Sequence, residues 1–394
     1  MAWRMNLVED QRKAFIEAHF DDLETMTDLC KKYDISRKTG YKWLLRHANG
    51  GASALRNESR APLTQAFKTD SRTVEEILRI KNWKTAWGPK KIEAFLKTHC
   101  PEIILPSRTT IGNILERNGL TVSRKLRRRV PGRTDPLAHC HTSNDVWCCD
   151  FKGWFLTGDG FKYEPFTMTD ADTRFLIRCV KLTRNDTNHV WPVVERSFRE
   201  CGLPLFMRND NGPPFGSCGV GRLTDLSILI IKAGVTPEWI DPGEPQQNGR
   251  HERMHLTLKN ETATPPASTI ALQDVRSRDF VEYYNFIRPH EGIGQRTPGS
   301  IYTLSPRQWD GVLRSPEYNS EYIVRGVRHN GSIRWKGEEI YVGKTLTGEP
   351  LGLKEIANGT FEVHYGPVFL GVIDPKCEFT MPPGKKRRRK IRTI

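Results

Sequence analysis

The chain has 394 residues, 37% of them hydrophobic and 9% aromatic, so it is long enough for about two to four domains and too apolar for wholesale disorder. Its 61 lysines and arginines exceed its 46 aspartates and glutamates, and the resulting charge of +15 favours a polyanionic partner such as nucleic acid. The longest apolar run, residues 226–231, is far too short to cross a bilayer and no signal-peptide core is present. We therefore expect a soluble, cytoplasmic protein with no membrane partner.

Residues 1–50 are predicted to form a helix-turn-helix DNA-binding domain of three short helices. A capping-box pattern at 25–28 opens the second helix, and Ser36 caps the third. Five apolar side chains are expected to pack between the helices: Leu29, Ile35, Tyr41, Leu44 and Leu45. Side chains expected to be exposed on the third helix, where they would enter a major groove, are Arg37, Lys38, Thr39 and Lys42. The alternative is a helical bundle that merely has a basic face.

A second helix-turn-helix-like unit is predicted over 67–120, with helices at 71–81, 89–98 and 108–118. Pro89 suits a first helical position, Ser107 a cap, and Gly119 a stop. A basic linker, 121–142, follows. Its cations are expected to contact backbone phosphates, although a solvated linker is the ordinary alternative: Arg124, Lys125, Arg127, Arg128 and Arg129.

Residues 143–305 alternate strands and helices. The predicted strands are 145–155, 163–170, 173–182 and 203–208, with a helix at 187–201 between the last two. Further helices are expected from Gln246 and over 274–287. Three antiparallel strands, a helix and another strand match the opening of a ribonuclease-H-like fold, which is an α/β mixed sheet covered by helices.

The C-terminal segment has a different pattern. Over 320–375, short strands are separated by Asn-Gly and Lys-Gly pairs, which is typical of hairpins and predicts a small β-barrel of five or six strands. Residues 376–394 form a basic tail. The predicted architecture is thus multidomain: all-α helix-turn-helix units, a central ribonuclease-H-like sheet and a C-terminal barrel.

Three acids stand in positions that suit metal chemistry. Asp150 lies in an apolar strand, Asp210 ends another strand at an Asn-Gly turn, and Glu252 opens a helix. If they converge, their hard oxygens suit Mg²⁺ or Mn²⁺, and two such ions about 3.5–4 Å apart serve phosphodiester chemistry without a protein nucleophile. The rival acids, which spacing alone leaves open, are Asp170, Asp172 and Glu261.

Several motifs together resemble the catalytic core of bacterial insertion-sequence DDE transposases, within the retroviral-integrase superfamily. The matching segments are Trp147-x-x-Asp150, the run from Asn209 to Phe215, Gln246-Gln247-Asn248-Gly249-x-x-Glu252-Arg253, Tyr284-Asn285-x-x-Arg288-Pro289-His290 and Thr297-Pro298, with Ile35 to Trp43 resembling the family's helix-turn-helix. The resemblance implies that Asp150, Asp210 and Glu252 are the catalytic, metal-binding triad and that Lys259 contacts the DNA end.

One spacing departs from the integrase pattern. Asp210 and Glu252 lie 42 positions apart (252 − 210), which is longer than usual, and we expect the extra residues, Gly219 to Ile231, to add a helical stretch.

The resemblance implies a DNA transposase that cleaves the ends of an insertion sequence and joins their 3′-hydroxyls to target DNA. Its partners would be double-stranded DNA, as terminal inverted repeats and target, and further copies of itself on paired ends. It would lie in the bacterial cytoplasm, bound to the nucleoid through DNA. The alternatives are a catalytically inactive, sequence-specific DNA-binding regulator derived from a transposase, and a ribonuclease acting on RNA–DNA hybrids.

Overall fold

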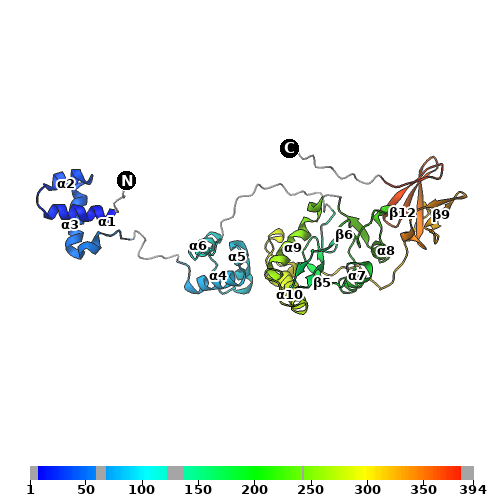
Figure 1. Cartoon of the computed structure of the whole chain (residues 1–394), viewed down its shortest axis with the longest axis horizontal. Helices are drawn as coiled ribbons and strands as arrows, with labels where there is room; N and C mark the ends of the chain where they lie inside the picture. Colours follow the sequence, from blue (N-terminus) through cyan, green and yellow to red (C-terminus); the bar gives the residue numbers. More distant parts are fainter. Residues whose placement is uncertain (1–7, 59–67, 122–136, 138, 242–243, 383–394) are drawn as a thin grey trace. The chain divides into compact units, whose positions relative to one another are not determined.

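The computed structural model describes residues 8–58, 68–121, 137, 139–241 and 244–382 (Figure 1). The chain divides into two compact units, Met1–Thr69 and Asp70–Ile394. In the described ranges, no helix combines the length and apolar character that crossing a membrane requires. The linker cations Arg124, Lys125, Arg127, Arg128 and Arg129 and the tail beyond residue 382 lie outside the described residues.

The first unit consists of α1 (Val8–Phe20), α2 (Met26–Lys32), α3 (Arg37–Gly50) and a short 3₁₀-helix, η1 (Gly51–Leu55). Its caps are as predicted: the Thr25 side chain accepts from Asp28 N, and Ser36 accepts from Thr39 N. Gly40 permits a close approach between helices, because a Cβ there would lie 2.9 Å from Cys30 Sγ. The three-helix pattern and its turn chemistry are confirmed.

The core of this unit is smaller than the sequence pattern indicates. Phe15, Ile16 and Leu29 are buried, but Tyr41 is 59% and Leu45 64% exposed, so the prediction that these two pack between the helices was wrong. With three short helices, the core has room for one face of α3, and the other face points to solvent.

The second unit begins with α4 (Ser71–Trp83), α5 (Pro89–His99) and α6 (Arg108–Arg117), close to the predicted bounds. Pro89 stands at the first position of its helix, Ser107 accepts from Thr110 N, and Gly119 has a φ of +66°, which ends α6. One buried cluster contains side chains of these helices together with Met254 and Phe280 of the central domain. The helices are therefore packed onto that domain rather than folded around a separate core.

The central segment forms one five-stranded mixed sheet in the order β5-β4-β1-β6-β7. β5, β4 and β1 are antiparallel neighbours, and β6 and β7 extend the sheet parallel to β1. The strands are β1 (Val146–Phe151), β4 (Pro165–Asp170), β5 (Leu176–Lys181), β6 (Phe206–Asn209) and β7 (Thr236–Trp239), with a small hairpin of β2 (Phe155–Leu156) and β3 (Lys162–Tyr163) between β1 and β4. The predicted mixed sheet is confirmed, except that its first strand ends at Phe151 and not at Phe155.

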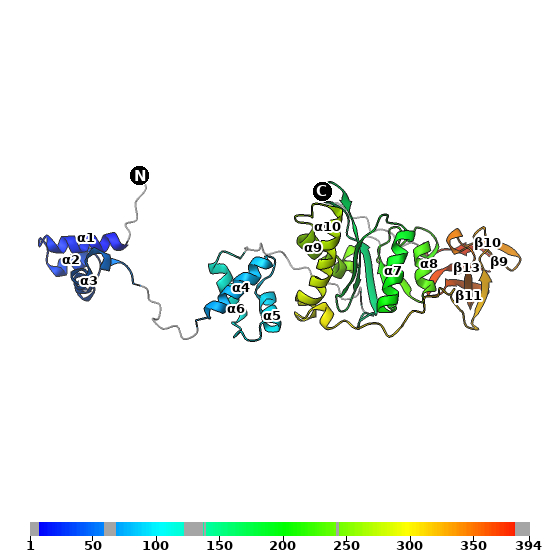
Figure 2. The ribbon, with the colours of Figure 1, turned by 90° about the horizontal axis from the view of Figure 1, so that it is seen from below.

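Helices cover both faces of this sheet, as Figure 2 shows: α9 and α10 lie on one face, and α7 and α8 on the other. Their bounds are α7 (Thr187–Cys201), α8 (Asp225–Lys232), α9 (Gly249–Thr262) and α10 (Ile270–Glu282), with shorter turns η3 (Val220–Arg222), η4 (Pro245–Asn248), the π-helix η5 (Tyr283–Ile287), η6 (Glu291–Ile293) and η7 (Pro298–Ser300). Trp147 and Cys149 of β1 pack in the cluster that includes α7 and α8. Because side chains alternate along a strand, Asp150 lies on the opposite, α9 face.

The long interval between Asp210 and Glu252 contains η3, α8 and β7. The expected helical stretch is thus present, and the strand that follows it is an addition to the predicted elements. β7 contains Pro237, which is tolerated because β7 is the last strand of the sheet.

The C-terminal segment folds into an open five-stranded antiparallel sheet in the order β14-β13-β12-β11-β8, with a separate β9–β10 hairpin. The strands are β8 (Tyr322–Gly326), β9 (Ser332–Trp335), β10 (Glu338–Tyr341), β11 (Pro350–Ala357), β12 (Thr360–Tyr365), β13 (Val368–Ile373) and β14 (Phe379–Thr380), with the 3₁₀-helix η8 (Lys344–Leu346) before β11. The predicted small β-barrel is not confirmed, since β8 and β14 each have a single strand neighbour among the described residues. Ile333 and Ile340 of the hairpin share a buried cluster with Leu353 and Val363 of the sheet. The hairpin therefore covers the apolar face of the open sheet, which a closed barrel would have buried inside itself.

Candidate active site

Asp150 and Asp210 lie side by side at the end of two parallel strands. β1 and β6 pair with Cys149 opposite Asn209; Asp150 is the next residue of β1, and Asp210 is the first residue after β6. Asp150 is half-buried and Asp210 is exposed. Each carboxylate also accepts a backbone hydrogen bond, from Phe151 N at 2.8 Å and from Asn211 N at 2.7 Å. The sheet therefore sets the direction of both acids.

Glu252 is the third acid, and like Asp210 it acts electrostatically on Asp150. It stands in the first turn of α9, exposed to solvent. The pKa of Asp150 is raised to about 7, first by burial and then by the negative charge of Asp210; Glu252 adds a smaller contribution, and the Phe151 N–H opposes the shift. The structure thus brings Asp210 and Glu252 within electrostatic range of Asp150.

The rival acids differ in their surroundings. Asp170 is fully buried and accepts hydrogen bonds from Asn144 N at 2.7 Å, Thr173 N at 2.8 Å and the Thr173 hydroxyl at 2.6 Å. Glu261 pairs with Lys84 of α4 at 3.1 Å. Asp170 stabilises a turn, and Glu261 stabilises the contact between α9 and α4. Asp172 lies half-buried in the turn after β4. Asp170 and Glu261 therefore have structural roles that account for their positions.

A buried network that no sequence pattern indicates ties α9 to the strands below it. The hydroxyl of Thr167, directly opposite Asp150 on β4, lies 2.8 Å from His251 Nε2 and 2.7 Å from His255 Nε2. The same hydroxyl donates to the backbone oxygen of Asp150 at 3.0 Å. In the sequence, a histidine on either side of a glutamate is ordinary for a solvated helix face, so no pattern distinguishes these two.

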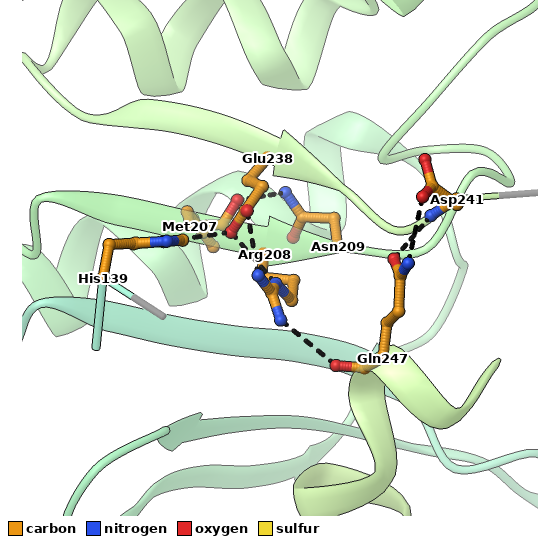
Figure 3. Close-up of polar contacts among 7 residues, drawn as sticks. All are labelled: His139, Met207, Arg208, Asn209, Glu238, Asp241 and Gln247. Atoms are coloured by element: carbon orange, nitrogen blue, oxygen red, sulfur yellow. Dashed lines mark hydrogen bonds and ion pairs between the residues drawn. The ribbon is translucent and has the colours of Figure 1, made fainter. Parts of the chain in front are cut away.

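A second polar network fixes the turn that leads into α9 (Figure 3). Arg208 of β6 is buried and forms two hydrogen bonds with Glu238 of β7, at 2.9 and 2.8 Å. It also donates to the backbone oxygen of Gln247 at 3.1 Å. The Gln247 side chain bridges to Asp241, donating to Oδ2 at 3.0 Å and accepting from Asp241 N at 2.8 Å. The strand that immediately precedes Asp210 is thereby connected to the start of the helix that carries Glu252.

The motif at 284–290 is structural in this fold. The Asn285 side chain forms two hydrogen bonds with the backbone of Leu176 on β5, at 2.8 and 3.0 Å. His290 is buried with its ring 4.4 Å from that of Tyr284, and its Nε2 lies 3.1 Å from the Tyr284 backbone oxygen. The motif anchors the π-helix after α10 to the edge strand and holds the end of the domain in place.

Of the predicted DNA contacts, those described by the structure are on two surfaces. Lys259 is exposed in the last turn of α9, seven residues beyond Glu252. Lys152, two residues after Asp150, lies near it, since burial and the charge of Lys259 lower the pKa of Lys152. On the first unit, the exposed or half-buried predicted contacts on α3 are Arg37, Lys38, Thr39 and Lys42.

The three acids fit a divalent cation by their chemistry. All their donors are carboxylate oxygens, which Mg²⁺ and Mn²⁺ prefer. The pKa of Asp150 is raised first by burial and then by the negative charge of Asp210, and a bound cation would oppose both effects. Among the described residues, no set of three or more His, Cys, Asp or Glu side chains is already arranged to hold a metal ion.

Two segments of the chain match known protein families. Residues 233–298 match the integrase core domain, a range that contains Glu252 and the motif at 284–290. Residues 322–379 match the C-terminal domain of IS481 family transposases. These matches confirm the resemblance to insertion-sequence transposases with an integrase-type core that the motifs indicate.

Similar solved structures include retroviral integrases. The HTLV-2 integrase catalytic core domain in complex with magnesium (trimeric form) is 15% identical over 41% of this chain and 97% of that chain, with a TM-score of 0.32. The BIV integrase core is 20% identical over 40% and 93%, with a TM-score of 0.32. The simian T-cell lymphotropic virus intasome, in complex with PP2A regulatory subunit B56 gamma, is 14% identical over 76% and 99%, with a TM-score of 0.35. Because these TM-scores are low, the assignment to a protein family rests on the two family matches alone.

Proposed function

We propose that this chain, which carries matches to an integrase core and to the C-terminal domain of IS481 family transposases, is a transposase that cleaves the ends of an insertion sequence and joins them to target DNA. The observation that carries the proposal is the group formed by Asp150, Asp210 and Glu252, in which neighbouring carboxylates help to raise the pKa of a half-buried aspartate. Such a concentration of negative charge is typical of a cation-dependent phosphoryl-transfer site.

In this proposal, Asp150, Asp210 and Glu252 hold two Mg²⁺ or Mn²⁺ ions. When bound, the ions supply activation of the attacking oxygen and stabilisation of the leaving oxygen. The attacking oxygen would belong first to water, which would hydrolyse a phosphodiester at the element's end and free its 3′-hydroxyl. It would then belong to that hydroxyl, which would attack a phosphodiester of the target and displace the 3′-oxygen of the target strand. The chain's own contribution is to hold the acids in fixed directions, so that little reorganisation accompanies the reaction.

Binding of DNA is divided among other residues. Lys259 and Lys152 would hold phosphates beside the acids, and α3 would read the terminal inverted repeat through Arg37, Lys38 and Lys42. Because two DNA ends must be joined together, the active form would be an assembly of several copies on double-stranded DNA.

The test is strand transfer with labelled element ends in Mg²⁺ or Mn²⁺. Asp150→Asn and Asp210→Asn should each reduce joining by more than about a hundredfold, because each removes a negatively charged ligand. Asp172→Asn is the matched control, since it neutralises a carboxylate of the same type outside the group of three, and it should retain activity. An Asp150→Asn protein with full joining activity would refute the proposal.

A gel shift in EDTA, together with a cleavage assay in Mn²⁺, separates the enzyme from the regulator. A protein that shifts element-end DNA in EDTA and leaves it intact in Mn²⁺ would be a DNA-binding regulator. That alternative leaves the grouping of three carboxylates without a role, so we favour the enzyme.

A further inference from the structure

One hydroxyl group lies at the junction of the two elements that carry the proposed acids. Thr167 is completely buried on β4, directly opposite Asp150 in the antiparallel register of β1 and β4. Its hydroxyl has three polar neighbours: the Asp150 backbone oxygen at 3.0 Å, His251 Nε2 at 2.8 Å and His255 Nε2 at 2.7 Å. The strand of Asp150 and the helix of Glu252 thus meet at a single oxygen atom.

Only one assignment of hydrogens satisfies every contact of this group. A threonine hydroxyl has one hydrogen and two lone pairs, and a backbone oxygen can only accept. The Thr167 hydrogen therefore goes to the Asp150 carbonyl, and both Nε2 atoms must carry a hydrogen and donate to Thr167. The Nδ1 atom of His251 then has a free lone pair, which accepts from the Thr169 hydroxyl at 2.7 Å. Each donor is matched by an acceptor, so the network has one arrangement.

The two histidines bracket Glu252 on α9. His251 immediately precedes it, and His255 is three residues later, on the next turn. Holding both rings on one oxygen fixes the rotation of the helix about its axis and its position along the axis. Since the third group on that oxygen is the backbone of Asp150, the same contacts fix Glu252 relative to Asp150.

We propose that Thr167 is a positioning residue of the carboxylate site, whose hydroxyl sets the placement of Glu252 relative to Asp150 and thereby the affinity of the site for a divalent cation. This inference rests on the proposed function. Outer hydrogen-bond partners of metal-binding groups commonly change metal affinity by about 10- to 100-fold when they are removed. Thr167 does not touch the cation or DNA in this proposal and acts only through β1 and α9.

The experiment measures Mn²⁺ binding to the full-length protein by calorimetry, without DNA. Thr167→Val keeps the shape of the side chain and removes the hydroxyl, and it should weaken Mn²⁺ binding by about 10-fold or more. Thr167→Ser keeps the hydroxyl and should restore affinity to within about threefold of the unmodified protein. In a Glu252→Gln background, Thr167→Val should have no further effect, because the two changes act on the same group.

Thr262→Val is the matched control. Thr262 is also buried and donates its hydroxyl to Leu258 O at 2.8 Å, but it is the last residue of α9, whereas Glu252 is in the first turn. It should leave Mn²⁺ affinity unchanged while lowering the melting temperature about as much as Thr167→Val does. If Thr167→Val fails to fold, His255→Leu replaces it, since it removes one donor to the same oxygen and should also weaken Mn²⁺ binding.

Three outcomes would overturn the inference. Thr167→Val could bind Mn²⁺ as tightly as the unmodified protein, which would leave the hydroxyl without a role at the site. Thr167→Ser could bind as weakly as Thr167→Val, which would assign the effect to packing of the methyl group. If the unmodified protein bound no Mn²⁺ and joined no DNA, the proposed function would fail as well, whereas the first two results would leave that function standing.

Discussion

At the scale of single residues, Asp150 combines burial with repulsion from other acids. Its pKa of about 7 lies above the ordinary value, so the folded protein holds this proton more tightly than the unfolded chain does. A raised carboxyl pKa stabilises the folded state at low pH, and that contribution is lost as the pH rises from about 4 through about 7. Without a cation, the site therefore lowers the stability of the protein at neutral and alkaline pH.

This linkage predicts the behaviour of Asp150→Asn. At pH 8 and without divalent ions, the free energy of unfolding of the variant should exceed that of the unmodified protein by an amount on the order of 1–3 kcal/mol. The difference should shrink as the pH is lowered toward 5. Thermal melts in EDTA across this pH range provide the measurement, and a variant that is less stable than the unmodified protein at pH 8 would contradict the expected sign.

Replacing Asp170 should lower the free energy of unfolding, whereas replacing Asp150 should raise it. Its carboxylate accepts three hydrogen bonds in a buried turn, so Asp170→Ala leaves three donors without this acceptor. We expect the free energy of unfolding to fall by about 3 kcal/mol or more. Asp210→Ala, at an exposed position, is the control and should change stability by less than about 1 kcal/mol. Denaturant titrations of the two variants compare these effects directly.

The sequence predicts which acids form the candidate site, but it does not predict the hydrogen bonds that position them. Asp150, Asp210 and Glu252 are identified from motif positions, and strand pairing then explains why the first two adjoin. Thr167 and His251 cannot be found in this way, because their importance arises from a contact between residues 84 positions apart. Spacing along one helix or strand carries no information about such a contact.

At the scale of elements, one buried cluster joins α4 and the loop after it to α9 and the π-helix. Trp87 is almost completely buried, its ring stacks on that of Tyr283, and its Nε1 donates to the Tyr283 hydroxyl at 3.0 Å. Beside it, Lys84 lies 3.6 Å from the centre of the Tyr283 ring and pairs with Glu261. On α5, Lys91 donates to the Pro289 backbone oxygen. These helices thus brace the helix of Glu252 from outside.

A double-mutant cycle tests this junction. Trp87→Phe and Tyr283→Phe each remove one partner of the hydrogen bond, and we expect a coupling energy of about 1 kcal/mol in the free energy of unfolding. Trp83→Phe is the control paired with Tyr283→Phe, because Trp83 is about half exposed and meets the Tyr283 ring edge to face, with 6.4 Å between the ring centres. Independent, additive effects for Trp87 and Tyr283 would show that the two side chains do not act together.

Helices are predicted more accurately than sheets, for physical reasons. The caps at Ser36 and Ser107 are local hydrogen bonds between residues three apart, so the sequence specifies them completely. β7 is not predicted, because four residues that include Pro237 do not form a recognisable strand pattern. The C-terminal barrel is predicted from hairpin turns, but whether a sheet closes depends on how its edge strands meet, and turns do not determine that.

At the scale of the whole molecule, charge is distributed in blocks. The tail contains six consecutive cations, Lys385 to Lys390, in a chain with a formal charge of +15. Removing them should weaken binding to non-specific DNA and reduce the slope of log affinity against log salt concentration, by up to about 0.9 for each phosphate that the tail neutralises. Filter binding over a range of salt concentrations measures the slope. The same truncation should leave the melting temperature unchanged, and an unaltered slope would exclude a DNA role for the tail.

The C-terminal sheet is bonded to the central domain through the segment that lengthens the interval between Asp210 and Glu252. Leu223, Ile228 and Ile231, in and beside α8, belong to the buried cluster of that sheet, and Lys232 pairs with Glu349 at 2.7 Å. Any DNA bound by the C-terminal sheet would consequently lie at a fixed distance from Asp150, Asp210 and Glu252. If the proposed function holds, the distance from the acids to that DNA would be set by the fold and would be the same for each DNA end.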